Sequence, residues 1–155
     1  MKKDEDKIRK RIVAALREFL SRSGDKEQVV KNVHGISEYG IDIEFYIRDF
    51  TGYIHCYGMQ VKAGNLCCGA NPNKGVKEII GQLAIASGKK SIRQSDSELD
   101  FSGFYVVVEG NISEDAMRYI KASFHNNKPI YFFYGEELES FLVKNEPKNL
   151  TTEQL

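Results

Sequence analysis

Hydrophobic positions along the chain follow first a helical period and then a strand period. Apolar side chains recur every three or four positions between residues 6 and 22, which predicts a helix with one apolar face. Residues 27 to 33, 40 to 47 and 54 to 62 predict three strands, and the segment RDFTGY between the last two predicts a hairpin turn. The first half of the chain therefore predicts a helix followed by a three-stranded meander.

The second half of the chain alternates predicted helices with predicted strands. The predicted helices span residues 76 to 87, 113 to 125 and 136 to 143, and the apolar runs at 103 to 109 and 129 to 134 predict buried strands. The polar stretches 64 to 75 and 88 to 102 predict loops. Two strands separated by a helix lie parallel through a right-handed crossover. Together the elements predict an α/β fold, a three-layer α/β/α sandwich with a mixed central sheet.

Length and composition favour a single globular domain. The chain has 155 residues, of which 41% are hydrophobic and 28% are charged. We expect one domain over residues 1 to 146 and a polar tail over residues 147 to 155. No apolar run approaches the roughly 20 residues of a bilayer-spanning helix, and the lysine-rich start lacks the apolar segment of a secretory signal. The expected location is the cytoplasm, without a membrane partner.

Charged and amide side chains interrupt two of the predicted strands. Alternation places Asp42 and Glu44 on one face of their strand, and Gln60 and Lys62 on one face of the next. A carboxylate, an amide oxygen and a main-chain carbonyl such as that of Val61 form an oxygen site suited to magnesium. Lys62 would orient a water and stabilise an anionic transition state. The structural alternatives are a strand-end cap for Asp42 and a lysine that extends its ammonium to solvent.

The order of these motifs resembles the PD-(D/E)XK phosphodiesterase superfamily. GIDI followed by GMQVK is most similar to the Mrr-type branch, in which glutamine commonly stands where other members have an acid, and the similarity extends over residues 5 to 144. The resemblance implies a restriction-endonuclease-like fold and an endonuclease that depends on Mg²⁺ or Mn²⁺. It implies Asp42, Gln60 and Lys62 as catalytic residues, with Asp42, Gln60 and the Val61 carbonyl as metal ligands.

The same resemblance implies a further ligand and a set of partners. The family often adds a glutamate from the first helix, for which Glu5 and Glu18 are the candidates, and Glu44 is an alternative. DNA is the implied substrate, with RNA as an alternative, and the implied role is prokaryotic restriction or antiviral defence. We expect a homodimer or a partner subunit. The second hypothesis is a catalytically inactive nucleic-acid-binding or protein-binding subunit of the same fold, because glutamine is a weaker ligand than a carboxylate.

Charge is distributed unevenly although the formal net charge is zero. Residues 62 to 93 contain six basic side chains and one acid, whereas residues 94 to 115 contain six acids and no lysine or arginine. A chain whose basic and acidic residues are separated in this way can present a basic face to a polyanion. The alternative is that these charges lie on loops and interact only with water. The expected nucleic-acid-binding residues are Lys74, Lys77, Gln82, Lys89, Lys90 and Arg93.

Cysteine and histidine positions indicate no further site. Cys56, Cys67 and Cys68 lack the paired spacing of a zinc site or a disulfide framework, so we expect buried free thiols. The three histidines match no catalytic-triad spacing, and we expect structural or surface roles for His34, His55 and His125.

Overall fold

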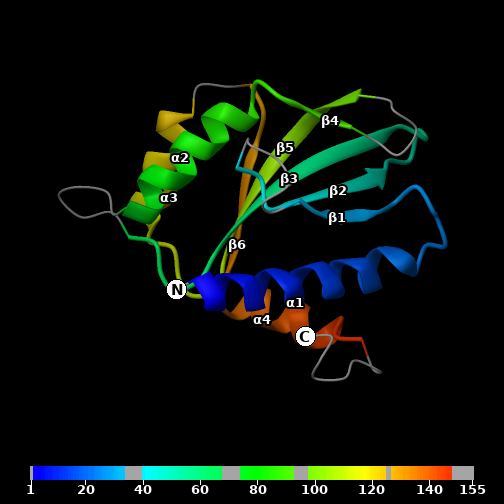
Figure 1. Ribbon diagram of the computed structural model, residues 1–155, viewed down its shortest axis with the longest axis horizontal. Coiled ribbons are helices and arrows are strands. Elements are labelled where there is room, and N and C mark those ends of the chain that lie inside the picture. The colour runs from blue at the N-terminus through cyan, green and yellow to red at the C-terminus, as the bar shows by residue number, and fades with distance from the viewer. Residues whose placement is uncertain (1, 34–39, 68–73, 93–97, 125–126, 148–155) are drawn as a thin grey trace.

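The computed structural model describes residues 2–33, 40–67, 74–92, 98–124 and 127–147. The described part is an α/β fold built around a six-stranded mixed sheet (Figure 1). Its elements in chain order are α1 (Lys2–Ser21), β1 (Val30–Asn32), β2 (Ile43–Arg48), β3 (Ile54–Lys62), α2 (Lys74–Ala86), β4 (Lys90–Ile92), β5 (Glu98–Val108), α3 (Glu114–Ser123), β6 (Ile130–Tyr134) and α4 (Gly135–Lys144). No helix in these ranges is long and apolar enough to cross a membrane.

The strand order confirms the predicted meander and the predicted parallel pair. Strands β1, β2 and β3 pair antiparallel in sequence, and Ile43 of β2 lies opposite Met59 of β3. Strand β5 then pairs parallel with β3 on one side and with β6 on the other. The sheet is therefore mixed, and the parallel strands β3, β5 and β6 end at the same edge.

The predicted loop over residues 88 to 102 is wrong in its described parts. Residues 90 to 92 form β4, which pairs antiparallel with the first residues of β5, so that Lys90 lies opposite Asp100. Strand β5 begins at Glu98 and not at residue 103. Most of this segment is polar, which favoured a loop, and the short β4 depends on backbone pairing in the sheet. Glu98, Leu99, Asp100 and Phe101 do alternate polar and apolar, so the start of β5 carries the local pattern of a strand. Residues 93 to 97 of the predicted loop, residues 68 to 73 of the other loop and tail residues 148 to 155 lie outside the described residues.

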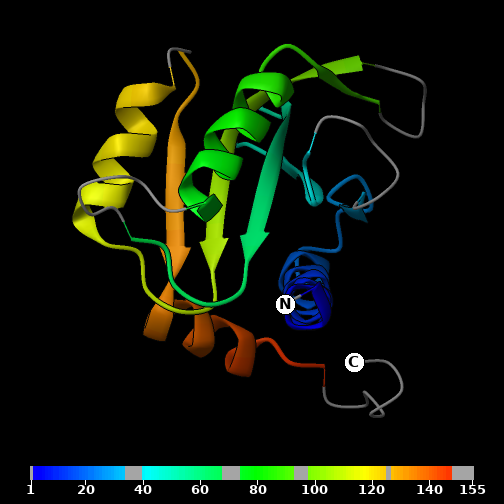
Figure 2. The same cartoon turned by 60° about the vertical axis from the view of Figure 1, so that its left-hand side comes forward.

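Helices cover both faces of the sheet and enclose two hydrophobic clusters (Figure 2). Helices α2 and α3 pack on one face against Val106 and Val108 of β5, and α1 and α4 pack on the other face against Val107. Adjacent residues of one strand thus enter opposite clusters, as the pleat of a strand requires. Because both faces are covered there, residues 103 to 108 of β5 form a continuous apolar run in the sequence.

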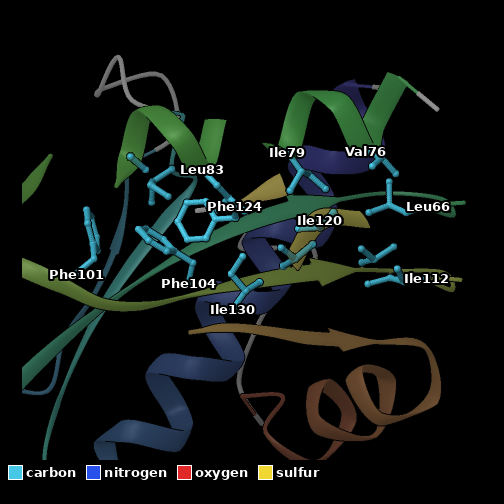
Figure 3. Packing of buried hydrophobic residues seen from close by; sticks show 14 of the residues in the cluster. Leu66, Val76, Ile79, Leu83, Phe101, Phe104, Ile112, Ile120, Phe124 and Ile130 are labelled. Carbon is cyan, nitrogen blue, oxygen red and sulfur yellow. The ribbon is translucent and has the colours of Figure 1, made fainter. Parts of the chain in front are cut away.

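Aromatic rings fill the cluster under α2 and α3 (Figure 3). The Phe104 ring lies 5.2 Å from the Phe101 ring and 5.8 Å from the Phe124 ring, and its side chain is completely buried. Gly58 of β3 lies directly against this group. A Cβ atom there would lie 3.0 Å from Ile41 Cδ1 and 3.2 Å from Phe104 Cδ1. The glycine therefore allows the Phe104 ring to pack against the β3 backbone.

Thiol burial differs in part from the prediction. Cys56 is buried in β3, as expected for a free thiol, but Cys67 is exposed. Cys67 follows the buried Leu66 in the polar loop after β3, so the chain turns its thiol to solvent. Cys68, His34 and His125 lie outside the described residues.

A serine caps the start of α3. Ser113 has extended backbone angles, and its Oγ accepts a hydrogen bond from the Ala116 amide at 3.1 Å. We expect Ser113→Ala to lower the free energy of unfolding by about 1 kcal/mol, because one amide at the helix start loses its partner. Urea denaturation followed by circular dichroism measures this loss. Ser140→Ala, at an exposed position within α4, is the control and should leave stability equal or slightly higher. Equal midpoints for the two variants would contradict the cap.

Candidate active site

The candidate residues meet at the edge of the sheet where β3 ends. Asp42 immediately precedes β2, and its amide donates a hydrogen bond to the Met59 carbonyl at 2.9 Å. Gln60 and Lys62 lie within the last three residues of β3. Because β2 and β3 are antiparallel, the start of one lies beside the end of the other. The hairpin thus brings together residues that are about twenty positions apart in the sequence.

Asp42 binds the backbone of β3 directly. Its Oδ2 accepts a hydrogen bond from the Val61 amide at 2.8 Å. This contact is the strand-end cap that was the structural alternative for Asp42, and it also fixes the carboxylate beside Val61. In an extended strand the N–H and C=O groups of one residue point to the same side. The Val61 carbonyl therefore points to the side of β3 on which the Asp42 carboxylate lies.

Gln60 is buried, and one hydrogen bond orients its amide. Only 1% of the residue is exposed, and Nε2 donates to the Gly40 carbonyl oxygen. The amide oxygen is thereby directed away from Gly40. Gly40 has a φ of 70°, and a Cβ atom there would lie 2.8 Å from Gln82 Cγ. A glycine is required at position 40 both by this backbone conformation and by the close approach of α2.

Lys62 lies between two acids from two different helices. Its Nζ donates to Glu78 Oε2 of α2 at 3.0 Å and lies 4.0 Å from Glu5 Oε1 of α1, while only 12% of its side chain is exposed. Two neighbouring carboxylates offset the cost of removing most of the ammonium from water. Glu78 was not among the predicted site residues. It is the single acid within the basic stretch from 62 to 93, and that isolation was the available signal.

The two candidate acids of the first helix occupy different places. Glu5 lies beside Lys62, whereas Glu18 is 13 positions later, about 20 Å further along the helix axis. Glu18 lines a separate hollow with Arg17, Ser21 and Pro147. The structure therefore brings Glu5 to the candidate site and does not bring Glu18 there.

Glu44, the other candidate ligand, is buried within the sheet. It lies opposite Gly58 of β3 and opposite Lys31 of β1, and only 2% of the residue is exposed. Opposite charges in facing positions of neighbouring strands stabilise a sheet. The register thus places Glu44 two residues further along β2 than Asp42 and faces it with Lys31.

The donor atoms at this edge suit a hard cation. They are the Asp42 carboxylate, the Gln60 amide oxygen and the Val61 carbonyl, with Glu5 as an acid on the neighbouring helix. Magnesium is bound in this way by few protein oxygens because it keeps several waters. Within the described ranges no three or more histidine, cysteine, aspartate or glutamate side chains group into a metal site. The set fits a water-rich magnesium site with one or two carboxylates.

The predicted nucleic-acid-binding residues separate into two groups. Lys77 is exposed in the first half of α2, near Glu78, whereas Lys89 and Lys90 are exposed beyond the other end of that helix. A helix of 13 residues is about 20 Å long, so Lys77 lies much nearer to Lys62 than Lys89 and Lys90 do. Gln82 packs against Gly40, and its Oε1 is buried without a hydrogen-bond partner in the described part of the chain. The side chain of Lys74 and all of Arg93 lie outside the described residues.

Relatives give no independent view of this site. No protein-family model, no curated protein and no solved structure matches the chain. The residues that meet at the end of β3, and the motif that they form, are therefore the features from which a function can be inferred.

Proposed function

We propose that this chain is a metal-dependent nuclease that hydrolyses phosphodiester bonds in DNA, with a restriction-endonuclease-like fold of the Mrr-type PD-(D/E)XK branch. The observation that carries the proposal is the meeting of Asp42, Gln60 and Lys62 at one sheet edge, joined by the hydrogen bond from the Val61 amide to Asp42. Glu5 of α1 beside Lys62 supplies the helix acid that the family often adds.

Each residue has a distinct task in this proposal. Asp42, Gln60 and the Val61 carbonyl would hold Mg²⁺ or Mn²⁺, which activates a water and neutralises charge on the phosphate when it is bound. Lys62 has three N–H donors, so it can contact Glu78 and Glu5 and still donate one hydrogen bond to the attacking water or to a phosphate oxygen. Glu78 and Glu5 thus hold the ammonium in place.

The proposed substrate and setting follow from the same assignment. Lys77 is exposed on α2 one position from Glu78 and would contact the DNA backbone. Cleavage of both strands of a duplex commonly uses two such sites, so we propose a homodimer or a partner subunit. We also propose a cytoplasmic protein of restriction or antiviral defence, and RNA is the alternative substrate because nothing at the site distinguishes the two sugars.

A cleavage assay tests the proposal directly. Purified protein is incubated with duplex DNA, single-stranded DNA and RNA, each with Mg²⁺, Mn²⁺ or EDTA. We expect cleavage that requires the metal, and the cleaved polymer names the substrate. Absence of cleavage in every mixture, together with no thermal stabilisation by either metal, would contradict the proposal.

A second candidate function is supported by the acidity of the neighbouring surface. Glu109, Glu136, Glu137 and Glu139 line a hollow at the ends of β5 and β6. Carboxylates repel a phosphate backbone but attract a basic protein surface. Asp42 and Lys62 also have partners within the chain itself. These features favour the alternative of an inactive protein-binding subunit, which would bind its partner without metal and cleave nothing.

Gln60→Glu tests whether Gln60 is a metal ligand or has only a structural role through its hydrogen bond to Gly40. Without metal, the new carboxylate faces the Gly40 carbonyl that accepted the Gln60 hydrogen bond, so we expect a loss of about 1–3 kcal/mol of stability. With Mg²⁺ the second carboxylate becomes a ligand, and the loss should be recovered. Thermal unfolding with and without Mg²⁺ measures both effects.

Gln60→Met is the matched control for this experiment. It loses the same hydrogen bond to Gly40 but adds no charge, so Mg²⁺ should not restore its stability. Equal responses of the glutamate and methionine variants to Mg²⁺ would remove Gln60 from the metal site.

A further inference from the structure

A second group of reactive side chains lies at the other end of β3 and β5. His55 of β3 places Nε2 2.5 Å from Asp49 Oδ2 and Nδ1 3.2 Å from Ser102 Oγ. Ser102 is six positions before Val108, which pairs with Lys62, so the group lies about 20 Å from the end of β3 that carries Lys62. It is open to solvent, with 36% of the His55 side chain exposed. The histidine spacing in the sequence had predicted a structural or surface role for His55.

The partners of His55 determine which nitrogen carries the proton. An ionised carboxylate only accepts hydrogen bonds, so Nε2 is the donor to Asp49. In the neutral ring Nδ1 then carries a lone pair and accepts the hydrogen bond from the Ser102 hydroxyl. A carboxylate, an imidazole and a serine in this order have the roles of a catalytic triad, here with the two ring nitrogens exchanged.

Asp49 is held rigidly by the hairpin between β2 and β3. Its Oδ1 accepts hydrogen bonds from the Thr51 hydroxyl at 2.5 Å, the Thr51 amide at 2.8 Å and the Tyr53 amide at 3.2 Å, which leaves Oδ2 for His55. The Thr51 hydroxyl, followed by His55, lowers the pKa of Asp49 far below its usual range. The carboxylate therefore stays ionised and keeps the imidazole in one orientation.

Ser102 lies at an irregularity of the sheet. Cys56 pairs with Phe101 and the next residue, Tyr57, pairs with Gly103, so Ser102 is an extra residue in β5. Such bulges occur next to active sites because they redirect one side chain. Gly103 directly follows the serine, and a Cβ atom there would lie 3.1 Å from the Pro129 carbonyl oxygen and 3.4 Å from Tyr57 Cε1. The backbone beside Ser102 is therefore bordered by an aromatic ring.

We propose that Asp49, His55 and Ser102 form a second, nucleophilic site at which Ser102 is acylated by aryl esters. Ser102 Oγ forms a bond to the carbonyl carbon while its proton passes to His55 Nδ1. His55 then gives this proton to the phenolic oxygen as the bond from the carbonyl carbon to that oxygen breaks. Water repeats the sequence on the acyl-serine, which releases the carboxylic acid and restores Ser102.

The aryl group is favoured by the tyrosines next to Gly103. The Tyr57 ring lies 5.7 Å from the Tyr105 ring, and the Tyr105 ring lies 4.9 Å from that of the exposed Tyr131. Neighbouring aromatic rings on a partly exposed sheet face bind a flat ring by stacking or edge contacts. This site shares no residue with the proposed nuclease site and does not depend on it.

The test uses para-nitrophenyl acetate with the full chain. We expect a burst of para-nitrophenolate, an intact mass increased by one acetyl group, and a peptide map that places this group on Ser102. Ser102→Ala should abolish the burst and the adduct, while Ser140→Ala, at the exposed α4 position, should retain both. An acetyl group found only on other residues, or no adduct at all, would overturn the proposal.

His55→Ala distinguishes catalysis from support of the hairpin. We expect acylation of Ser102 to slow by about 10²–10⁴-fold, and added imidazole to restore part of the rate, which a purely structural histidine would not allow. Thermal unfolding of His55→Ala checks that this variant remains folded. Ser102→Cys, which keeps His55, should still be acetylated at position 102. Equal rates for the parent and His55→Ala would overturn the role of His55.

Metal-dependent DNA cleavage by Ser102→Ala should match the parent, so a failure of one site is distinguishable from a failure of the other.

Discussion

Lys62→Ala is expected to lower metal-dependent DNA cleavage by about 10²–10³-fold, the usual loss when a donor to the transition state is removed. The Lys62 ammonium is held between Glu78 and Glu5 at the end of β3, beside Asp42 and Gln60. Alanine removes this ammonium group from the residue next to Val61, whose amide binds the Asp42 carboxylate. Gel-based cleavage with Mg²⁺ over a time course measures the loss. Binding of DNA should weaken far less than cleavage, because the lost contact acts mainly in the transition state.

Two controls separate chemistry from charge and from folding. Lys26→Ala removes an exposed lysine that follows the end of α1 opposite to Glu5, so we expect cleavage within a few-fold of the parent. The stability of Lys62→Ala should remain close to that of the parent, because Glu78 and Glu5 are partly exposed and stay solvated without their partner. If Lys62→Ala cleaves DNA as fast as Lys26→Ala, Lys62 is not catalytic.

Phe104→Ala is expected to lower the free energy of unfolding by about 3–5 kcal/mol. The Phe104 ring is fully buried between Phe101 and Phe124, and it packs against Gly58. Alanine removes these contacts and leaves a cavity that the rigid sheet backbone cannot fill by relaxing. Urea denaturation followed by circular dichroism measures the change in midpoint.

Phe50→Ala is the matched control, since it makes the same chemical change at a fully exposed position of the β2–β3 hairpin. We expect its stability to lie within about 0.5 kcal/mol of the parent. Similar midpoints for Phe104→Ala and Phe50→Ala would show that the cluster in Figure 3 does not carry the stability assigned to it.

Local patterns predicted most of the secondary structure correctly. The first helix, the three-stranded meander and the parallel pair of late strands follow from periods of 3.6 and 2 and from the crossover rule. The prediction failed at β4, where the sequence is polar, and at the start of β5, where residues 98 to 101 alternate polar and apolar but follow a long polar stretch. There the strands exist because Lys90 and its neighbours pair with residues 98 to 100, and pairing partners are not a local property.

The candidate site was predictable only as far as one hairpin extends. Alternation along two adjacent strands placed Asp42 near Gln60 and Lys62, and the hydrogen bond from Val61 to Asp42 has the geometry that this arrangement requires. The choice between Glu5 and Glu18 was not predictable. Both acids lie on one predicted helix, and only the packing of α1 across the sheet decides which of them meets Lys62.

The sequence by itself determined the helices, most of the strands and the group of an acid, an amide and a lysine on one hairpin, because these follow from side-chain periods over short distances. Only the tertiary structure decided that Glu5 and Glu78 meet at Lys62, and that His55 lies between Asp49 and Ser102. Asp49 and His55 are six positions apart across one hairpin, but the other three contacts join residues 16 to 57 positions apart. Those three arise from helix packing and from the parallel pairing of β3 with β5. Such pairings depend on the whole fold, so no local pattern of residues encodes them.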